Sequence, residues 1–212
     1  IQTDLLVIAT GLKPETTLAK DAGCKLNENG YIIVNNKCET SVKDIYAVGD
    51  CTEFKDFITK KSVQIGLGSI AVRQGISAGI NAAGGNYTLL DGFLQTCTSE
   101  FFGIEIAAVG SSDEKLVTGK FNGLSLPHYF PGGKPIIIKV FANKDGKILG
   151  AQAVGDNAAQ RINTLAAAIL GGLDIETFRR LETAYAPPIA PTLDAITLAC
   201  DIISAKLSKR QK

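Results

Sequence analysis

The segment IIIKVFANKDGKILGAQAVG constrains the fold more than any other stretch, because it joins two apolar runs through an Asp-Gly turn. The runs are Ile136 to Phe141 and Ile148 to Val154, and the turn between them is Asn143 to Gly146. Asp-Gly between two apolar runs is a strong short-range signal for a β-hairpin. The segment therefore predicts two neighbouring antiparallel strands.

The rest of the second half fits a sheet that is followed by helices. A further strand is expected at Glu105 to Val109. Helices are expected after the hairpin, at Asn157 to Leu170, Ile175 to Leu181 and Thr192 to Leu207. Strands followed by helices are typical of an α+β domain whose helices pack on one face of an antiparallel sheet.

The first half alternates short apolar runs with helical stretches, which is typical of an α/β domain. Strands and helices are expected at Leu5 to Ala9, Pro14 to Ala22, Tyr31 to Val34, Ile45 to Val48 and Gly68 to Ala83. We expect Ser69 to cap the helix at Gly68 to Ala83, and Gly84 and Gly85 to end it. The chain is expected to hold two domains, residues 1–90 and 91–212.

Charge and cysteine usage exclude several classes of protein. The 22 Lys+Arg nearly cancel the 21 Asp+Glu, so no basic surplus indicates a nucleic-acid partner. No apolar run is long enough to span a bilayer, so no membrane partner is expected. The five cysteines are odd in number and form no CxxC pair, so neither a disulfide framework nor a metal site is indicated. A cytoplasmic location is the expectation.

The stretch DIYAVGDC ends an apolar run in Gly49-Asp50, and two interpretations of Asp50 are open. Ligands of parallel sheets bind at the carboxyl ends of strands, where a carboxylate can accept hydrogen bonds from ligand hydroxyls. Alternatively, Asp50 is a turn residue that bonds to its own backbone. Thr10-Gly11 ends another apolar run, and Leu67-Gly68-Ser69 opens a helix whose free N–H groups favour an anion or a carbonyl. Together these features predict one concave site.

Several motifs then follow in a fixed order along the chain. ATGLKPETTLAKDAG, GYIIV and TSVKDIYAVGD are followed by the helical stretch IAVRQGISAGINAAGG, then by GKILGAQAVG and AYAPPIAPTLDAI. This order resembles the late FAD-domain segment and the dimerisation domain of the pyridine nucleotide-disulfide oxidoreductases. The Tyr-Ala-Pro-Pro motif is similar to that of the branch with NADH oxidases, NADH peroxidases and coenzyme A-disulfide reductases.

The resemblance implies the C-terminal part of an FAD-binding Rossmann-like domain, followed by an α+β dimerisation domain with an antiparallel sheet. It implies that FAD is bound by Thr10, Gly11, Gly49, Asp50, Leu67, Gly68 and Ser69. Asp50 would contact the ribityl or phosphate region, and the helix start would lie near the flavin pyrimidine carbonyl. NADH or NADPH would be the electron donor, with its site in a domain outside these residues.

The resemblance also implies that Tyr185 reaches the flavin site of the other subunit in a homodimer, where its phenol would donate a hydrogen bond or a proton. Tyr129 is a second catalytic candidate near the same site. Arg73 is a candidate for binding an anionic substrate such as a coenzyme A phosphate. The alternatives are a packed aromatic with a satisfied hydroxyl for Tyr185 and a surface salt bridge for Arg73.

The implied reaction passes electrons from NAD(P)H through FAD to a disulfide, a peroxide or oxygen. The family's GxGxxG turn and redox cysteine do not occur in these 212 residues, so we expect a fragment that is inactive by itself. Cys51 is expected to be a small buried residue rather than the redox cysteine. The alternative function is a non-catalytic dimerisation or binding module derived from this family.

Overall fold

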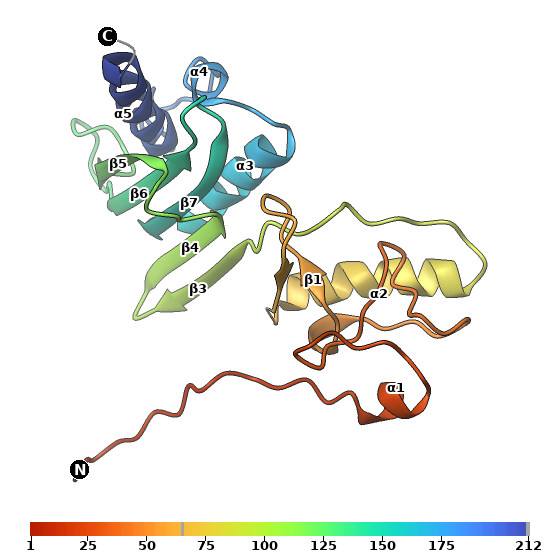
Figure 1. The fold of residues 1–212 in the computed structure, drawn as a ribbon. Coiled ribbons are helices and arrows are strands. Elements are labelled where there is room, and N and C mark those ends of the chain that lie inside the picture. The colour runs from red at the N-terminus through yellow and green to blue at the C-terminus, as the bar shows by residue number, and fades with distance from the viewer. Residues whose placement is uncertain (65, 211–212) are drawn as a thin grey trace. The chain divides into compact units, whose positions relative to one another are not determined.

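A computed structural model describes residues 1–64 and 66–210, which divide into two compact units (Figure 1). The first unit comprises Ile1–Lys55 and Lys60–Gly92. The second comprises Asp56–Thr59 and the residues from Phe93 onward. The short segment Asp56–Thr59 therefore belongs to the second unit, although the residues on both sides of it belong to the first.

The second unit is built on a five-stranded antiparallel sheet with the strand order β3-β4-β7-β6-β5. The strands are β3 (Cys97–Phe101), β4 (Ile104–Gly110), β5 (Val117–Leu124), β6 (Pro135–Ala142) and β7 (Ile148–Gly155). The predicted hairpin is confirmed as β6 and β7, and the strand predicted at Glu105 to Val109 lies within β4. Strands β3 and β5 were not expected from the sequence.

Asn143 closes the turn between β6 and β7. Its side-chain oxygen accepts hydrogen bonds from the N–H groups of Asp145 and Lys147, at 3.0 and 2.9 Å. Gly146 has a φ of 83°, in the left-handed region that glycine enters without steric cost. The Asp-Gly pair therefore forms the turn that the sequence predicts.

All three helices expected in the second half are present (Figure 1). Helix α3 (Ala158–Leu170) packs against β4 and β7, and α5 (Ala195–Arg210) packs against β5 and β6. The short helix α4 (Ile175–Phe178) packs against α5 and ends earlier than predicted. Across the described residues of the whole chain, no helix combines the length and the apolar character that crossing a membrane requires.

The core of the second unit lies between these helices and one face of the sheet. Ile136, Ile138 and Val140 of β6 are fully buried, whereas the alternate residues between them are partly exposed. Gly119 of β5 permits a close approach of α5, because a Cβ at this position would lie 1.9 Å from the carbonyl oxygen of Ala199. The α+β prediction for this half is confirmed.

The first unit contains little regular structure besides one long helix. Its elements are α1 (Thr17–Asp21), the 3-10 turn η1 (Gly49–Cys51), the antiparallel pair β1 (Phe54–Lys55) and β2 (Ser62–Val63), and α2 (Gly68–Ala82). The long helix is predicted correctly, but its cap is not. The helix begins at Gly68, so its N-cap is Leu67 and not Ser69, and the apolar leucine side chain makes no capping hydrogen bond.

The strands predicted in the first unit are wrong. Tyr31 to Val34 and Ile45 to Val48 form only isolated one-residue bridges. Leu5 to Ala9 lies in an exposed stretch without secondary structure, where Leu6 is 73% exposed (Figure 1). A strand needs a neighbouring strand to satisfy its backbone N–H and C=O groups. The described residues supply such a neighbour only at single positions of the second and third of these segments, at Ile32 and Tyr46, and at none of the positions from Leu5 to Ala9.

Candidate functional site

Asp50 lies in the turn η1, which buried hydrogen bonds fasten to helix α2. The N–H of Gly49 donates to the side-chain oxygen of Gln74 at 2.7 Å, and the hydroxyl of Thr52 donates to the Gly49 carbonyl at 2.8 Å. Gln74 is 2% exposed and Thr52 is fully buried. Because the backbone is held in this way, the exposed side chain of Asp50 projects from a fixed support.

The carboxylate of Asp50 lies beside Gly66, just before α2 begins. A Cβ at position 66 would lie 2.7 Å from Oδ2 of Asp50, so a side chain there would push the carboxylate out of its present position. Within the described residues, no protein group donates a hydrogen bond to this carboxylate. Its oxygens are therefore available to a ligand that carries hydroxyl groups.

The first turn of α2 presents N–H groups that the helix itself leaves unused. The carbonyl of Leu67 accepts hydrogen bonds from the N–H groups of Ile70 and Ala71, at 2.9 and 3.1 Å. The N–H groups of Gly68 and Ser69 precede the first N–H that has a partner within the helix. A Cβ at Gly68 would meet nothing within 4 Å. This helix start can therefore receive a carbonyl oxygen or an anion.

The structure does not bring Thr10 and Gly11 to the other predicted cofactor residues. Both are exposed, and a Cβ at Gly11 would meet nothing within 4 Å. Arg73, the predicted substrate residue, is exposed on α2, and its Nη1 donates to the Ser69 carbonyl at 2.8 Å. Arg73 therefore lies along the first turn of α2 and forms no salt bridge with the described residues.

Gln74 is a site residue that was not predicted, although the sequence carries a signal for it. Ile70, Gln74, Ser77 and Asn81 follow one another at helical spacing and form the buried face of α2. Buried polar side chains need hydrogen-bond partners. Asn81 binds both the N–H and the carbonyl of Tyr87, at 2.8 Å each. A polar stripe at helical spacing thus indicates a helix that holds neighbouring loops.

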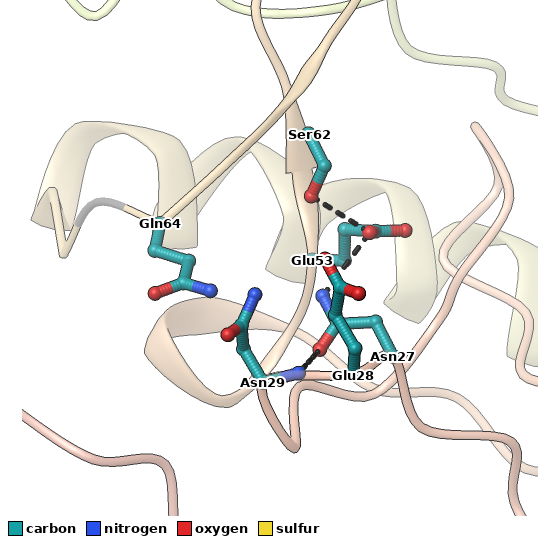
Figure 2. A pocket seen from close by; sticks show the side chains of 6 residues that line it. All are labelled: Asn27, Glu28, Asn29, Glu53, Ser62 and Gln64. Atoms are coloured by element: carbon teal, nitrogen blue, oxygen red, sulfur yellow. Dashed lines mark hydrogen bonds between the residues drawn. The ribbon is translucent and has the colours of Figure 1, made fainter.

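The first unit also contains a polar pocket of about 460 Å³ (Figure 2). It is lined by Asn27, Glu28, Asn29, Glu53, Ser62 and Gln64. Glu53 Oε1 accepts hydrogen bonds from the Ser62 hydroxyl at 2.7 Å and from the Asn27 amide at 3.1 Å (Figure 2). Because its lining includes two carboxylates, this pocket disfavours a phosphate group.

Tyr129 and Tyr185, the two predicted catalytic residues, lie together in the second unit. Their hydroxyl oxygens are 3.0 Å apart, and either can donate the hydrogen bond. Tyr129 is 62% exposed and Tyr185 is 48% exposed. The hydrogen bond with Tyr185 raises the pKa of the Tyr129 hydroxyl above its ordinary value. The ring of His128 meets that of Tyr129 edge-on, with 5.6 Å between the ring centroids. The pair presents two phenol hydroxyls at an open surface.

Three cysteines, Cys38, Cys51 and Cys200, are poorly suited to redox chemistry. Burial raises the pKa of the Cys51 and Cys38 thiols, and it raises the pKa of Cys200 to about 12. The nucleophilic form of cysteine is the thiolate, which a raised pKa disfavours. The structure therefore gives Cys51 no activation, although it follows Asp50 directly. In residues 1–64 and 66–210, no group of ligand side chains could hold a metal ion.

Comparisons with known proteins cover both units. The family model described as pyridine nucleotide-disulphide oxidoreductase matches residues 1–75, and the model of that family's dimerisation domain matches residues 96–196. An NADH oxidase of Methanocaldococcus jannaschii is 39% identical over 98% of this chain and 48% of its own length. A CoA-dependent NAD(P)H sulfur oxidoreductase of Pyrococcus furiosus is 37% identical over 95% of this chain and 47% of its own length.

A solved structure shows the same arrangement of elements. The reduced CoADR-RHD of Bacillus anthracis is 35% identical, with a TM-score of 0.88 over 99% of this chain and 39% of its own. This chain spans about half the length of the curated relatives that it matches, at 48% and 47%. The predicted fold class, an α/β part followed by an α+β domain, is confirmed by these matches. The chain belongs to the pyridine nucleotide-disulphide oxidoreductase family.

Proposed function

We propose that this chain is part of an FAD-dependent NAD(P)H oxidoreductase and that it supplies one wall of the flavin site. One observation carries the proposal: the carboxylate of Asp50, to which no group of the described residues donates a hydrogen bond, lies beside Gly66, close to the start of α2, where no side chain caps the helix. The relatives named NADH oxidase and NAD(P)H sulfur oxidoreductase support the same class of reaction. FAD, when bound, supplies the redox chemistry by accepting a hydride from NADH or NADPH and passing the electron pair to an acceptor.

Asp50 fits the ribityl chain of FAD better than its phosphates. A carboxylate accepts hydrogen bonds from hydroxyl groups, whereas it repels a phosphate of the same charge. Gly49 and Gly66 flank it without side chains, so a chain of hydroxyl-bearing carbons can approach closely. A Cβ at Gly66 would press on the carboxylate, at 2.7 Å from its oxygen. The hydrogen-bond acceptor at this turn therefore fits the group that the family implies.

The start of α2 fits the pyrimidine edge of the flavin. The N–H groups of Gly68 and Ser69, at the positive end of the helix dipole, would receive a ring carbonyl and stabilise negative charge on the reduced ring. Leu67 would contact the ring through its backbone. We also keep Thr10 and Gly11 in the proposed site, because the resemblance to the family implies them. The exposed apolar run before them has no neighbouring strand among the described residues, so their exposure here does not argue against this role.

Arg73 is proposed to bind the anionic part of a substrate. Its Nη1 donates to the Ser69 carbonyl. Its other N–H groups bond to none of the described residues and are available to a ligand. A coenzyme A phosphate would suit this exposed guanidinium. The proposed acceptors are therefore small molecules: a disulfide, including one that contains coenzyme A, a peroxide or oxygen.

Tyr185 and Tyr129 are proposed to supply protons to the reduced acceptor. Because the pKa of Tyr129 is raised, its hydroxyl stays protonated at neutral pH and can restore a proton that Tyr185 has donated. In a homodimer, which the matched dimerisation domain supports, this pair would serve the flavin site of the partner subunit. The tyrosines would thus act on an acceptor that is bound by the partner subunit.

The test uses the complete gene product that contains this chain. We expect it to purify with a flavin absorbance that NADH or NADPH bleaches without oxygen, and that coenzyme A disulfide, peroxide or oxygen restores. The acceptor that reoxidises the flavin fastest is then identified as the substrate. A product that remains colourless after incubation with FAD would contradict the proposal and would favour a non-catalytic dimerisation or binding module.

A further inference from the structure

The two tyrosines belong to separate loops of the second unit. Tyr129 lies between β5 and β6, and Tyr185 lies between α4 and α5. The loop of Tyr185 is weakly packed, since Leu181, Ile189 and Leu193 are 49%, 78% and 50% exposed. A cavity of about 260 Å³ is lined on one side by this loop and on the other by α3. Burial alone therefore does not fix the position of Tyr185.

Arg161 of α3 holds the end of the Tyr185 loop. Its Nε donates to both carboxylate oxygens of Asp194, at 3.2 and 3.0 Å. Asp194 also accepts the N–H of Ile196 at 3.0 Å, where α5 begins. The side chains of Arg161 and Asp194 are only 11% and 22% exposed, so solvent ions screen their attraction little.

The same arginine reaches the base of the Tyr129 loop through Asp156. Its Nη1 donates to the Asp156 carbonyl at 2.6 Å. The N–H of Asp156 donates to the Pro135 carbonyl at 3.0 Å, at the start of β6. Directly before it, the Lys134 carbonyl accepts the N–H of Ser125 at 2.8 Å and closes the Tyr129 loop. One side chain thus connects the bases of both loops.

We propose that Arg161 is a positioning residue that sets the two tyrosine loops against each other, through Asp194 on one side and Asp156 on the other. The planar guanidinium can bind a carboxylate and a carbonyl at the same time in fixed directions, which a lysine ammonium cannot do. Without this link, the loop of Tyr185 moves away and the hydrogen bond between the tyrosines is lost. The consequence for catalysis rests on the proposed function.

The first experiment follows the pKa of Tyr129 in the folded chain. Tyrosine is replaced by 3-fluorotyrosine, the ¹⁹F resonances are titrated, and Tyr129→Phe assigns the signal. Tyr185→Phe gives the pKa of Tyr129 without its partner. We expect Arg161→Met to lower the Tyr129 pKa to the value found in Tyr185→Phe.

Two control variants separate positioning from general loss of stability. Arg180→Met removes another ion-paired arginine of this unit, which is bonded to Glu176, and should leave the Tyr129 pKa at the wild-type value. Ile162→Val weakens the core at the residue next to Arg161 and should also leave it unchanged. A folded Arg161→Met chain with the wild-type Tyr129 pKa would overturn the proposal.

Milder variants cover the case in which Arg161→Met does not fold. Arg161→Lys keeps the charge and should give a Tyr129 pKa between those of wild type and Tyr185→Phe. Asp194→Asn should shift it in the same direction. Wild-type values in both variants would overturn the positioning role.

The second experiment uses the complete flavoenzyme and measures its two half-reactions. Arg161→Met should lower the rate of acceptor reduction by about 10–100-fold, the usual effect of misplacing a reacting group, and leave flavin reduction by NAD(P)H unchanged. An equal loss in both half-reactions would contradict positioning. Absence of flavin reduction in the wild type would instead contradict the proposed function. The Tyr129 titration would still test the positioning role of Arg161, because it does not depend on flavin chemistry.

Discussion

The two units contain similar apolar runs with opposite fates. Leu5, Leu6, Val7 and Ile8 of the first unit are 77%, 73%, 76% and 78% exposed. The run that begins at Ile136 in the second unit has its alternate residues fully buried. That run has β5 and β7 on its two sides and helix α5 on one face, whereas the described residues give the first run no neighbouring strand. Burial is thus decided by the partners that the chain supplies to a run, and not by its composition.

The largest expected effect tests this difference with one pair of substitutions. Ile138→Ala should destabilise the second unit by about 2–5 kcal/mol, because it leaves a cavity in a closed core. Leu6→Ala should change stability by less than about 0.5 kcal/mol, because the side chain is already exposed. Urea unfolding followed by NMR signals of each unit measures both. A large loss for Leu6→Ala would show that its run is buried in solution.

Replacing a glycine by alanine should change stability in opposite directions in the two units. Gly119→Ala should destabilise the second unit by about 1–3 kcal/mol, since its Cβ would overlap the Ala199 carbonyl and force α5 away. Gly75→Ala on α2 meets nothing within 4 Å and should stabilise the helix by about 0.5–1 kcal/mol. Thermal unfolding of Gly119→Ala against wild type measures the first effect. Hydrogen exchange of the α2 amides in Gly75→Ala measures the second. Destabilisation by Gly75→Ala would reveal a surface packed on that face.

The hydrogen bonds under Asp50 give the next prediction. Gln74→Leu should cost the first unit about 1–3 kcal/mol, because it leaves the buried N–H of Gly49 without its acceptor. Gln160→Leu, at an exposed position of α3, is the matched control and should have little effect. Hydrogen exchange at the Gly49 amide should accelerate in Gln74→Leu only. Unchanged protection there would disprove the role assigned to Gln74.

The smallest effect concerns Asp56 of the second unit, which contrasts with Asp50. Its Oδ1 accepts N–H groups of Ile58 and Thr59, at 3.1 and 2.6 Å, and its Oδ2 accepts the Gln95 amide at 2.7 Å. Burial raises the pKa of Asp56, but these hydrogen bonds together outweigh burial and hold the pKa below its ordinary value. Its contribution to stability is therefore present above the unfolded pKa and is lost as the pH falls through the folded pKa.

The acid limb of the unfolding curve measures this contribution. As the pH falls below about 4, the ordinary pKa of aspartate, the wild-type second unit should lose stability more steeply than Asp56→Asn. Gln95→Leu removes one of the donors and should give an intermediate slope. Parallel curves for wild type and Asp56→Asn would show that this carboxylate does not contribute to acid sensitivity.

The sequence predicted those elements whose signals are local. The Asp145-Gly146 turn and the helical stretches of the second half needed only neighbouring residues to be recognised. Strand β5 was missed because Gly119 and Gly123 weaken its apolar pattern, and its place depends on α5 and β6. The run at Leu5 to Ala9 was overpredicted for the opposite reason, since its pattern is strong but the described residues give it no partner.

The candidate site divides in the same way. Asp50 and the helix start at Gly68 were predicted because the end of an apolar run and the start of a helix are visible in the local sequence. The roles of Gly66 and Gln74 depend on contacts across the first unit, with Asp50 and Gly49. The link made by Arg161 between two loops likewise has no local pattern.

The central claim, that Asp50 contacts bound FAD, is tested most directly by the FAD affinity of the complete gene product. Asp50→Asn is compared with wild type and with Asp21→Asn, which alters another exposed aspartate of the first unit. We expect Asp50→Asn to raise the Kd for FAD about 10–100-fold, the effect of weakening a hydrogen bond to a charged group. Asp21→Asn should retain the wild-type Kd. An Asp50→Asn protein that binds FAD as tightly as wild type would contradict the account.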